Sequence, residues 1–106
     1  MRRLVLAAVA AVFMGPAAMA DQASALKAVK AQPRVVDAVV DNSGNLFASV
    51  KPEAKVPWDQ FAAQLCGLVR PHQGRIFSVK VVDLTSVTPA RKPSEWRRLG
   101  ESRCAG

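Results

Sequence analysis

Two cysteines are the most reactive side chains of this chain. Cys66 and Cys104 are its only thiols, and neither lies in a Cys-x-x-Cys pair of the kind that redox enzymes use. The N-terminal segment indicates export to an oxidising compartment, where two such cysteines are expected to pair. We therefore predict a structural Cys66–Cys104 disulfide, which would stabilise the fold by about 4 kcal/mol through loop closure. A catalytic disulfide is the alternative.

His72 is the only histidine and the only candidate for a general base at neutral pH. It follows an expected helix, in a turn over residues 71–74, and no serine, cysteine or carboxylate has a recognisable nucleophile or relay spacing to it. We interpret it as an exposed turn histidine. With the two cysteines it would supply at most three scattered metal ligands, two of which oxidation would remove. We therefore expect no enzyme activity, no cofactor and no metal site.

Three carboxylates could gather if the strands that carry them were neighbours. Asp37 and Asp41 share one face of an expected strand, and Asp83 lies near the end of another. Such a cluster would bind a cation or a basic peptide. Because strand register is not known from sequence, we favour the other interpretation, that these acids lie on the solvated side of an antiparallel sheet.

The C-terminal tail, residues 85–106, is basic, contains two prolines and has few aliphatic residues. A tryptophan among cations suits an anionic lipid headgroup or an acidic sugar. The alternative is a solvated tail whose tryptophan packs on the domain. Nucleic acid would fit the charge but is not expected outside the cytoplasm. The candidate anionic-surface residues are Arg91, Lys92, Trp96, Arg97 and Arg98.

Residues 1–20 have the three parts of a secretory signal peptide: Arg2 and Arg3, an apolar run over residues 4–14, and a small-x-small site that ends at Ala20. We expect cleavage there, a periplasmic or secreted product and no transmembrane segment. An uncleaved anchor is the alternative, but the run is short for a span. Without this segment the chain has 13 basic and 8 acidic residues, a net charge of +5. That charge favours anionic partners, or serves solubility alone.

The elements that would hold these residues centre on residues 57–71, PWDQFAAQLCGLVRP. Pro57 suits a first helical turn and Pro71 ends the helix. The apolar residues recur at helical spacing and form one stripe, which should cover a sheet. The stripe consists of Trp58, Phe61, Ala62, Leu65, Leu68 and Val69.

Flanking segments predict the sheet and a second helix. Residues 21–32 predict a short helix capped by Ser24, and residues 35–51 a hairpin around the turn Asn42-Ser43-Gly44. Residues 75–84 predict a third strand, apolar on both faces. Three further expectations concern side chains: Val36, Ala38 and Val40 share a face, so do Phe77, Val79 and Val81, and Ser94 caps a helical turn that joins Trp96 to Leu99.

The predicted fold is α+β, in the order α-β-β-α-β. Three antiparallel strands, in the sheet order two, one, three, have both helices on one face. One small domain spans residues 21–106. It includes the tail, which Cys104 would tether to the central helix.

This pattern resembles a BON-type domain, a small module of bacterial periplasmic proteins. The resemblance covers Ala25–Leu84: the ALKA helix, the hairpin VVDAVVDNSGNLFASV, an amphipathic helix and a valine-rich strand. The chain has Gly74-Arg75-Ile76 where the family usually has Gly-Val, and it adds the cysteine pair and the tail. The resemblance implies association with membrane surfaces or envelope components, without catalysis. It transfers no functional residue.

We expect a small exported, non-enzymatic binding or accessory protein of the bacterial periplasm. Its partner would be an anionic lipid, a polysaccharide or an acidic protein surface. The alternative is an inhibitor-like or structural protein that blocks a partner enzyme. The sequence leaves the oligomeric state open.

Overall fold

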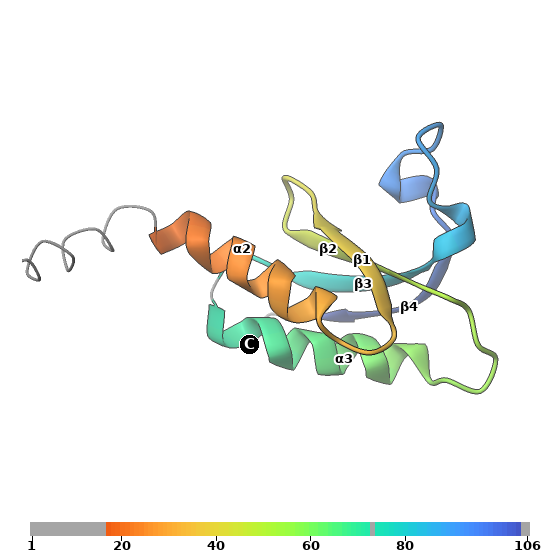
Figure 1. The fold of residues 1–106 in the computed structure, drawn as a ribbon, viewed down its shortest axis with the longest axis horizontal. Coiled ribbons are helices and arrows are strands. Elements are labelled where there is room, and N and C mark those ends of the chain that lie inside the picture. The colour runs from red at the N-terminus through yellow and green to blue at the C-terminus, as the bar shows by residue number, and fades with distance from the viewer. Residues whose placement is uncertain (1–16, 73, 105–106) are drawn as a thin grey trace, which may run out of the picture.

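The computed structural model describes residues 17–72 and 74–104, which form a four-stranded sheet with two helices on one face (Figure 1). The predicted signal peptide lies largely outside these residues, since only its last four belong to the first helix. The elements are α2 (Ala17–Lys30), β1 (Val35–Val40), β2 (Asn45–Val50), α3 (Trp58–Val69), β3 (Ser78–Asp83) and β4 (Arg98–Arg103).

The sheet is mixed, and its order is β1-β2-β3-β4. The predicted hairpin is confirmed, because β1 and β2 pair antiparallel. The predicted three antiparallel strands in the order two, one, three are wrong: β3 pairs parallel to β2, with α3 as the crossover that a parallel pair requires. The reason is burial. All residues of β2 from Leu46 to Val50 are buried, so β2 is an inner strand, whereas Val36 and Val39 of β1 remain exposed.

A fourth strand, β4, forms from the tail and pairs antiparallel with β3. The predicted order of elements has no strand in the tail, and this is wrong: β4 belongs to the sheet, and Gly100 and Cys104 are buried. The sequence RLGESR has one large apolar residue and a glycine, so it lacks the pattern of a strand. Gly100 is required because a Cβ there would lie 2.5 Å from the main-chain carbon of Trp58 in α3.

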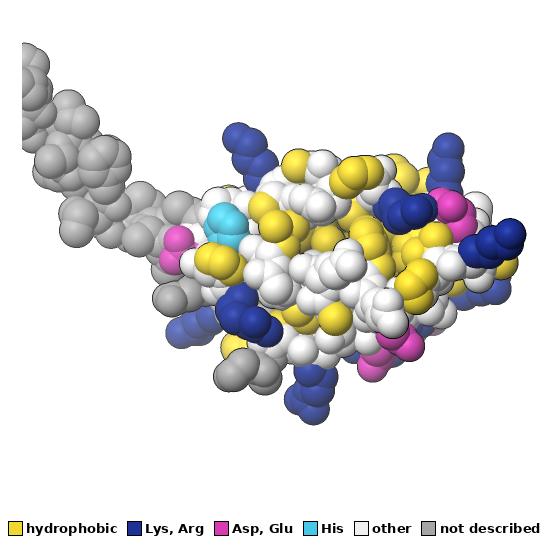
Figure 2. Space-filling view, turned by 90° about the horizontal axis from the view of Figure 1, so that it is seen from below, with side chains coloured by type: hydrophobic (Ala, Val, Ile, Leu, Met, Phe, Trp, Pro, Cys, Tyr) yellow, Lys and Arg dark blue, Asp and Glu magenta, His cyan; other side chains and the backbone are white. Residues whose placement is uncertain are grey.

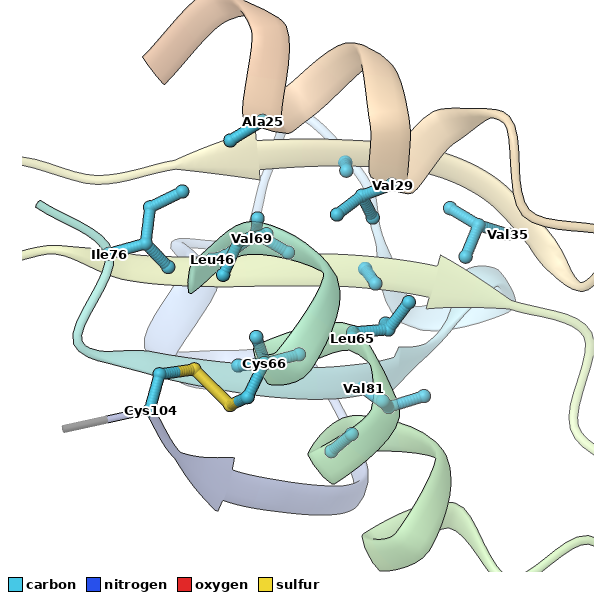
Figure 3. Packing of buried hydrophobic residues seen from close by; sticks show 14 of the residues in the cluster. Ala25, Val29, Val35, Leu46, Leu65, Cys66, Val69, Ile76, Val81 and Cys104 are labelled. Atoms are coloured by element: carbon cyan, nitrogen blue, oxygen red, sulfur yellow. A yellow bond between two sulfur atoms is a disulfide. The ribbon is translucent and has the colours of Figure 1, made fainter. Parts of the chain in front are cut away.

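The core lies between α3, α2 and the sheet (Figure 3). The predicted stripe of α3 covers the sheet as expected, but it is centred on Ala62, Leu65 and Cys66, while Phe61 and Leu68 are only half-buried. From α2, Ala25 and Val29 complete the core. These buried side chains of the helices and the sheet form one apolar cluster.

The Cys66–Cys104 disulfide is confirmed, with the two Cα atoms 5.0 Å apart. Both cysteines are buried at the edge of the core, where Figure 3 shows the bond joining α3 to the chain after β4. The bridge thus ties the last strand to the central helix.

Two local irregularities reverse predicted side-chain directions. A β-bulge between Val35 and Asp37 turns Val35 inward and leaves Val36 53% exposed, so Val36 does not share the buried face of Ala38. Before β3, Arg75 has a left-handed backbone with φ 61°. As a result Ile76 enters the core and Phe77 is 55% exposed, the opposite of the predicted alternation.

On each edge strand of the sheet, an aspartate accepts a hydrogen bond from one main-chain N–H. On β1, the Ala38 N–H donates to Asp37 Oδ1 at 2.8 Å. On β4, the Glu101 N–H donates to Asp59 Oδ1 of α3 at 3.0 Å. One donor on each edge is therefore not available to a further strand.

The packing of α3 makes a stability prediction. Leu65→Ala should lower the free energy of unfolding by about 2–5 kcal/mol, because Leu65 is 2% exposed in the core. Gly67→Ala should raise it by about 0.5–1 kcal/mol, since nothing lies within 4 Å of a Cβ at this helical position. Urea unfolding of the oxidised protein measures both. Equal effects of the two substitutions would contradict the orientation of α3.

Candidate functional site

The segment between β3 and β4, residues 84–96, leaves the sheet and returns to it. Its ends meet where the Asp83 N–H donates to the Arg97 carbonyl at 2.9 Å. Figure 1 shows it projecting beyond the end of the sheet, away from the helices. Compact loops with adjoining ends are frequently functional. We call residues 84–96 the projecting loop.

Side chains hold the base of the projecting loop. The Asp83 carboxylate accepts hydrogen bonds from the Thr85 N–H and hydroxyl at 2.8 and 2.7 Å, and Arg97 Nη1 lies 3.5 Å from it. The buried Ser86 hydroxyl donates to the Asp83 carbonyl at 2.7 Å and accepts from the Arg97 N–H at 2.8 Å. The bonds from Thr85, and to a lesser degree Arg97, lower the pKa of Asp83. The base is therefore fixed by an ionised carboxylate.

The tip of the projecting loop is the exposed stretch Thr88–Lys92. The Arg91 N–H donates to the Thr88 carbonyl at 3.1 Å. A short 3-10 turn over Pro93–Glu95 follows, in which the Lys92 N–H donates to Glu95 Oε1 at 3.0 Å. The backbone on both sides of Arg91 and Lys92 is thus hydrogen-bonded while their side chains stay in solvent.

Trp96 anchors the loop on the face of the sheet opposite the helices. Its ring meets Phe47 of β2 edge-on, with centroids 5.5 Å apart. The predicted helical turn capped by Ser94 and joining Trp96 to Leu99 is wrong, because the chain extends after Glu95 and enters β4. Trp96 therefore takes the packing role that the sequence left as the alternative.

The four predicted cations fall into two pairs. Arg97 faces Asp83, and Arg98 Nη1 lies 2.8 Å from Glu101 Oε1 on the same strand. Arg91 and Lys92, at the loop tip, have no acidic partner among residues 17–72 and 74–104. The structure thus separates Arg91 and Lys92 from the aromatic ring and leaves them as the cations at the tip.

His72 lies half-buried in a 3-10 turn after α3, with Nδ1 2.8 Å from the Ser24 hydroxyl. The predictions that His72 is an exposed turn residue and that Ser24 caps a helix are both wrong, since α2 begins at Ala17 and encloses Ser24. The Ser24 hydroxyl, which has a single proton to donate, also lies 3.1 Å from the Asp21 carbonyl oxygen. The direction of the contact with His72 depends on the tautomer of the ring, and a second acceptor for the hydroxyl proton, the Asp21 carbonyl, is at hand.

The three carboxylates do not gather. β2 lies between the strands of Asp37 and Asp83, and Asp41 lies at the opposite end of the sheet from Asp83. Asp41 accepts hydrogen bonds from the backbone of Ser43 and Asn45 in the hairpin turn. In the described ranges, no three His, Cys, Asp or Glu side chains are placed to hold a metal ion. These acids hold local structure.

A second feature, which the sequence did not predict, lies at the start of β3. The projecting loop follows the other end of this strand. A pocket of about 340 Å³ is lined by Gln22, residues 40–44, Arg75 and Phe77. We call this surface the Phe77 patch. Alternation in RIFSVKVV predicted a buried Phe77, and no sequence signal marks the left-handed Arg75. By contrast, the Asp-x-Thr of the loop base is a recognisable turn signal.

Comparisons with protein-family models, with curated proteins and with solved structures each found no match to this chain. The resemblance to a BON-type domain therefore stays a hypothesis. Within residues 17–72 and 74–104, no helix has the length and hydropathy needed to cross a bilayer. Figure 2 shows the face of the molecule on which α3 lies. Basic side chains project around the edge of this face, and apolar side chains lie nearer its middle. Positive charge is therefore not confined to the projecting loop.

The lowered pKa of Asp83 predicts a pH-dependent loop base. The ionised carboxylate stabilises the fold fully above the unfolded pKa of about 3.9, and this stabilisation is lost as pH falls through the lower folded value. Asp83→Asn keeps an acceptor for Thr85 but removes the charge. The variant should unfold at lower temperature than the parent at pH 7, with the gap closing below about pH 4. Thermal unfolding at pH 2–7 measures this, and a pH-independent gap would contradict it.

Proposed function

We propose that the protein is a small exported, non-enzymatic binding protein of the bacterial periplasm that contacts phosphate groups of an anionic envelope component. The observation that carries this proposal is the Arg91–Lys92 pair, exposed on the projecting loop without acidic partners in the described chain. Phosphates of lipid headgroups and of lipopolysaccharide share the chemistry that such cations bind. The contact needs no catalytic group.

The fixed base of the loop supports this role energetically. Asp83, Ser86 and Trp96 hold both ends, so binding at the tip orders little additional chain. Each cation near an anionic membrane contributes about 1 kcal/mol, so the pair would supply roughly 2 kcal/mol, a factor of about 30 in affinity. Because Trp96 is turned inward, the contact is electrostatic and salt-sensitive.

Export is part of the proposal and has its own support. The buried Cys66–Cys104 disulfide is compatible with an oxidising compartment. The basic, apolar and small-residue order of residues 1–20 is that of a secretory signal.

An inhibitor-like protein is the second candidate, and the same loop favours it. Residues 88–92 form an exposed, basic stretch with both flanks held, a shape that suits an acidic cleft of a partner enzyme. This version requires a complex of fixed stoichiometry that lowers the activity of one enzyme as protein is added. Binding to vesicles requires neither.

Charge reversal at the loop tip tests the proposal. Arg91→Glu/Lys92→Glu should weaken binding to phosphatidylglycerol vesicles or to lipopolysaccharide at least tenfold at low salt, because the cations facing the phosphates are replaced by anions. Sedimentation with vesicles measures it, and comparison of the two anionic ligands identifies the source of the phosphate. Neutral phosphatidylcholine vesicles should bind neither protein.

Lys27→Glu/Lys55→Glu is the matched control, since both lysines are exposed and the change in net charge is the same. The control should retain most of the binding. Equal loss in both variants would reduce the effect to net charge, and no binding by the parent at low salt would overturn the proposal.

A further inference from the structure

The Phe77 patch exposes the largest aromatic surface that the described residues leave in solvent. Phe77 is 55% exposed, beside the pocket of about 340 Å³ that residues 40–44, Arg75 and Gln22 also line. Exposed aromatic and arginine side chains are the residue types enriched in protein interfaces. The patch lies at the start of β3, and the projecting loop follows the end of that strand, so the two surfaces are independent.

The backbone beneath Phe77 is rigid. The Gly44 carbonyl accepts hydrogen bonds from the Phe77 and Ser78 N–H groups at 2.8 and 3.3 Å. Gly44 has φ 83°, and a Cβ there would collide with the Phe77 ring, so this turn tolerates only glycine. Arg75 itself is held in a left-handed conformation. The chain therefore keeps an apolar ring in water on a fixed support, which is a feature of binding surfaces rather than of loose loops.

The patch carries charges of both signs. Arg75 is exposed and has no acidic partner among the residues described. Burial alone would raise the pKa of Asp41, but hydrogen bonds from Asn45 and Ser43 outweigh it and lower this pKa, so the carboxylate is ionised at neutral pH. The lining of one pocket thus combines an apolar ring, a cation and an anion, and a second copy turned by 180° offers each of these its complement.

We propose that two copies of this protein associate through the Phe77 patch about a two-fold axis. The two Phe77 rings meet at the axis, and Arg75 of each copy faces Asp41 of the other. A second copy fits better than a bilayer or a polyanion, because Asp41 would repel an anionic surface.

The dimer is weak by its size. Standard interfaces use roughly 20–30 residues from each partner, whereas this patch is limited to one turn, one short segment and the start of α2. A Kd on the order of 100 µM is expected for so small a contact. The association is therefore concentration-dependent.

Sedimentation velocity of the purified protein from about 10 µM to 1 mM tests the proposal. The apparent mass should rise toward that of a dimer, and Phe77→Ser should weaken association at least tenfold. Arg75→Glu should do the same by placing two carboxylates together, while Arg91→Glu, the same charge change at the projecting loop, should leave association unchanged. A parent protein that is monomeric throughout, or a dimer untouched by Phe77→Ser, would overturn it.

A cross-linking experiment tests the symmetry. A cysteine at a two-fold axis faces its own copy, so Phe77→Cys should form a covalent dimer under oxidising conditions much faster than Val39→Cys, which changes another exposed apolar residue away from the patch. Equal rates of cross-linking in the two variants would show that Phe77 does not lie at the two-fold axis. Both variants retain vesicle binding if the Phe77 patch and the projecting loop act separately, so failure here leaves the phosphate proposal standing.

Discussion

Burial of β2 on both of its faces is the constraint from which most of this structure follows. Leu46, Ala48 and Val50 pack under the helices, while Phe47 and Ser49 are buried on the other side. A strand with two buried faces needs a neighbour on each edge and cover on each side. β1 and β3 supply the neighbours and α3 crosses over one face. On the other face, Trp96 from the end of the projecting loop packs against Phe47.

The same constraint gives the loop its rigidity. Trp96 is drawn onto the sheet because Phe47 would otherwise face water, and the loop must then turn sharply to reach β4. The Ser86 hydroxyl makes two hydrogen bonds to the backbone at that turn, while the Asp83 carboxylate accepts one from the Thr85 N–H and also contacts the Thr85 hydroxyl and Arg97. What remains free is the tip. The N–H groups of Arg91 and Lys92 are hydrogen-bonded within the loop, and the two side chains remain in solvent.

Local features of this fold and its one disulfide could be predicted from the sequence, whereas the pairing of the strands could not. The helical spacing from Trp58 to Val69 and the Asn-Ser-Gly turn specify α3 and the hairpin by themselves. Two cysteines allow only one bridge, so the disulfide was also within reach. The strand order depended on whether β1 or β2 would be inner, and β1, with four valines against one in β2, has the stronger pattern of a central strand. In the structure β1 is the edge strand and carries a bulge at Val36, and nothing in the sequence marks that bulge.

The candidate site divides in the same way. Its residue types were recognisable, but their grouping was not: Arg98 pairs with Glu101, three residues away, whereas Arg97 pairs with Asp83, which only the fold brings close. The exposure of Phe77 was not predicted, because one left-handed residue, Arg75, shifts the alternation of side chains before β3 begins. A two-residue period detects neither ion pairs between strands nor a single displaced side chain.

The strand that sequence patterns failed to mark, β4, supports both proposed surfaces. Just before it, the Arg97 carbonyl and N–H close the base of the projecting loop. Just after it, the Cys104 N–H donates to the Phe77 carbonyl at 2.8 Å, and the disulfide fixes this end to α3. Because β4 contributes little apolar area of its own, its position depends on Gly100 fitting against α3 and on that bridge. The disulfide therefore stabilises more than the fold: it holds the backbone beneath Phe77 at one end of β4 and, through the strand, the base of the loop at the other.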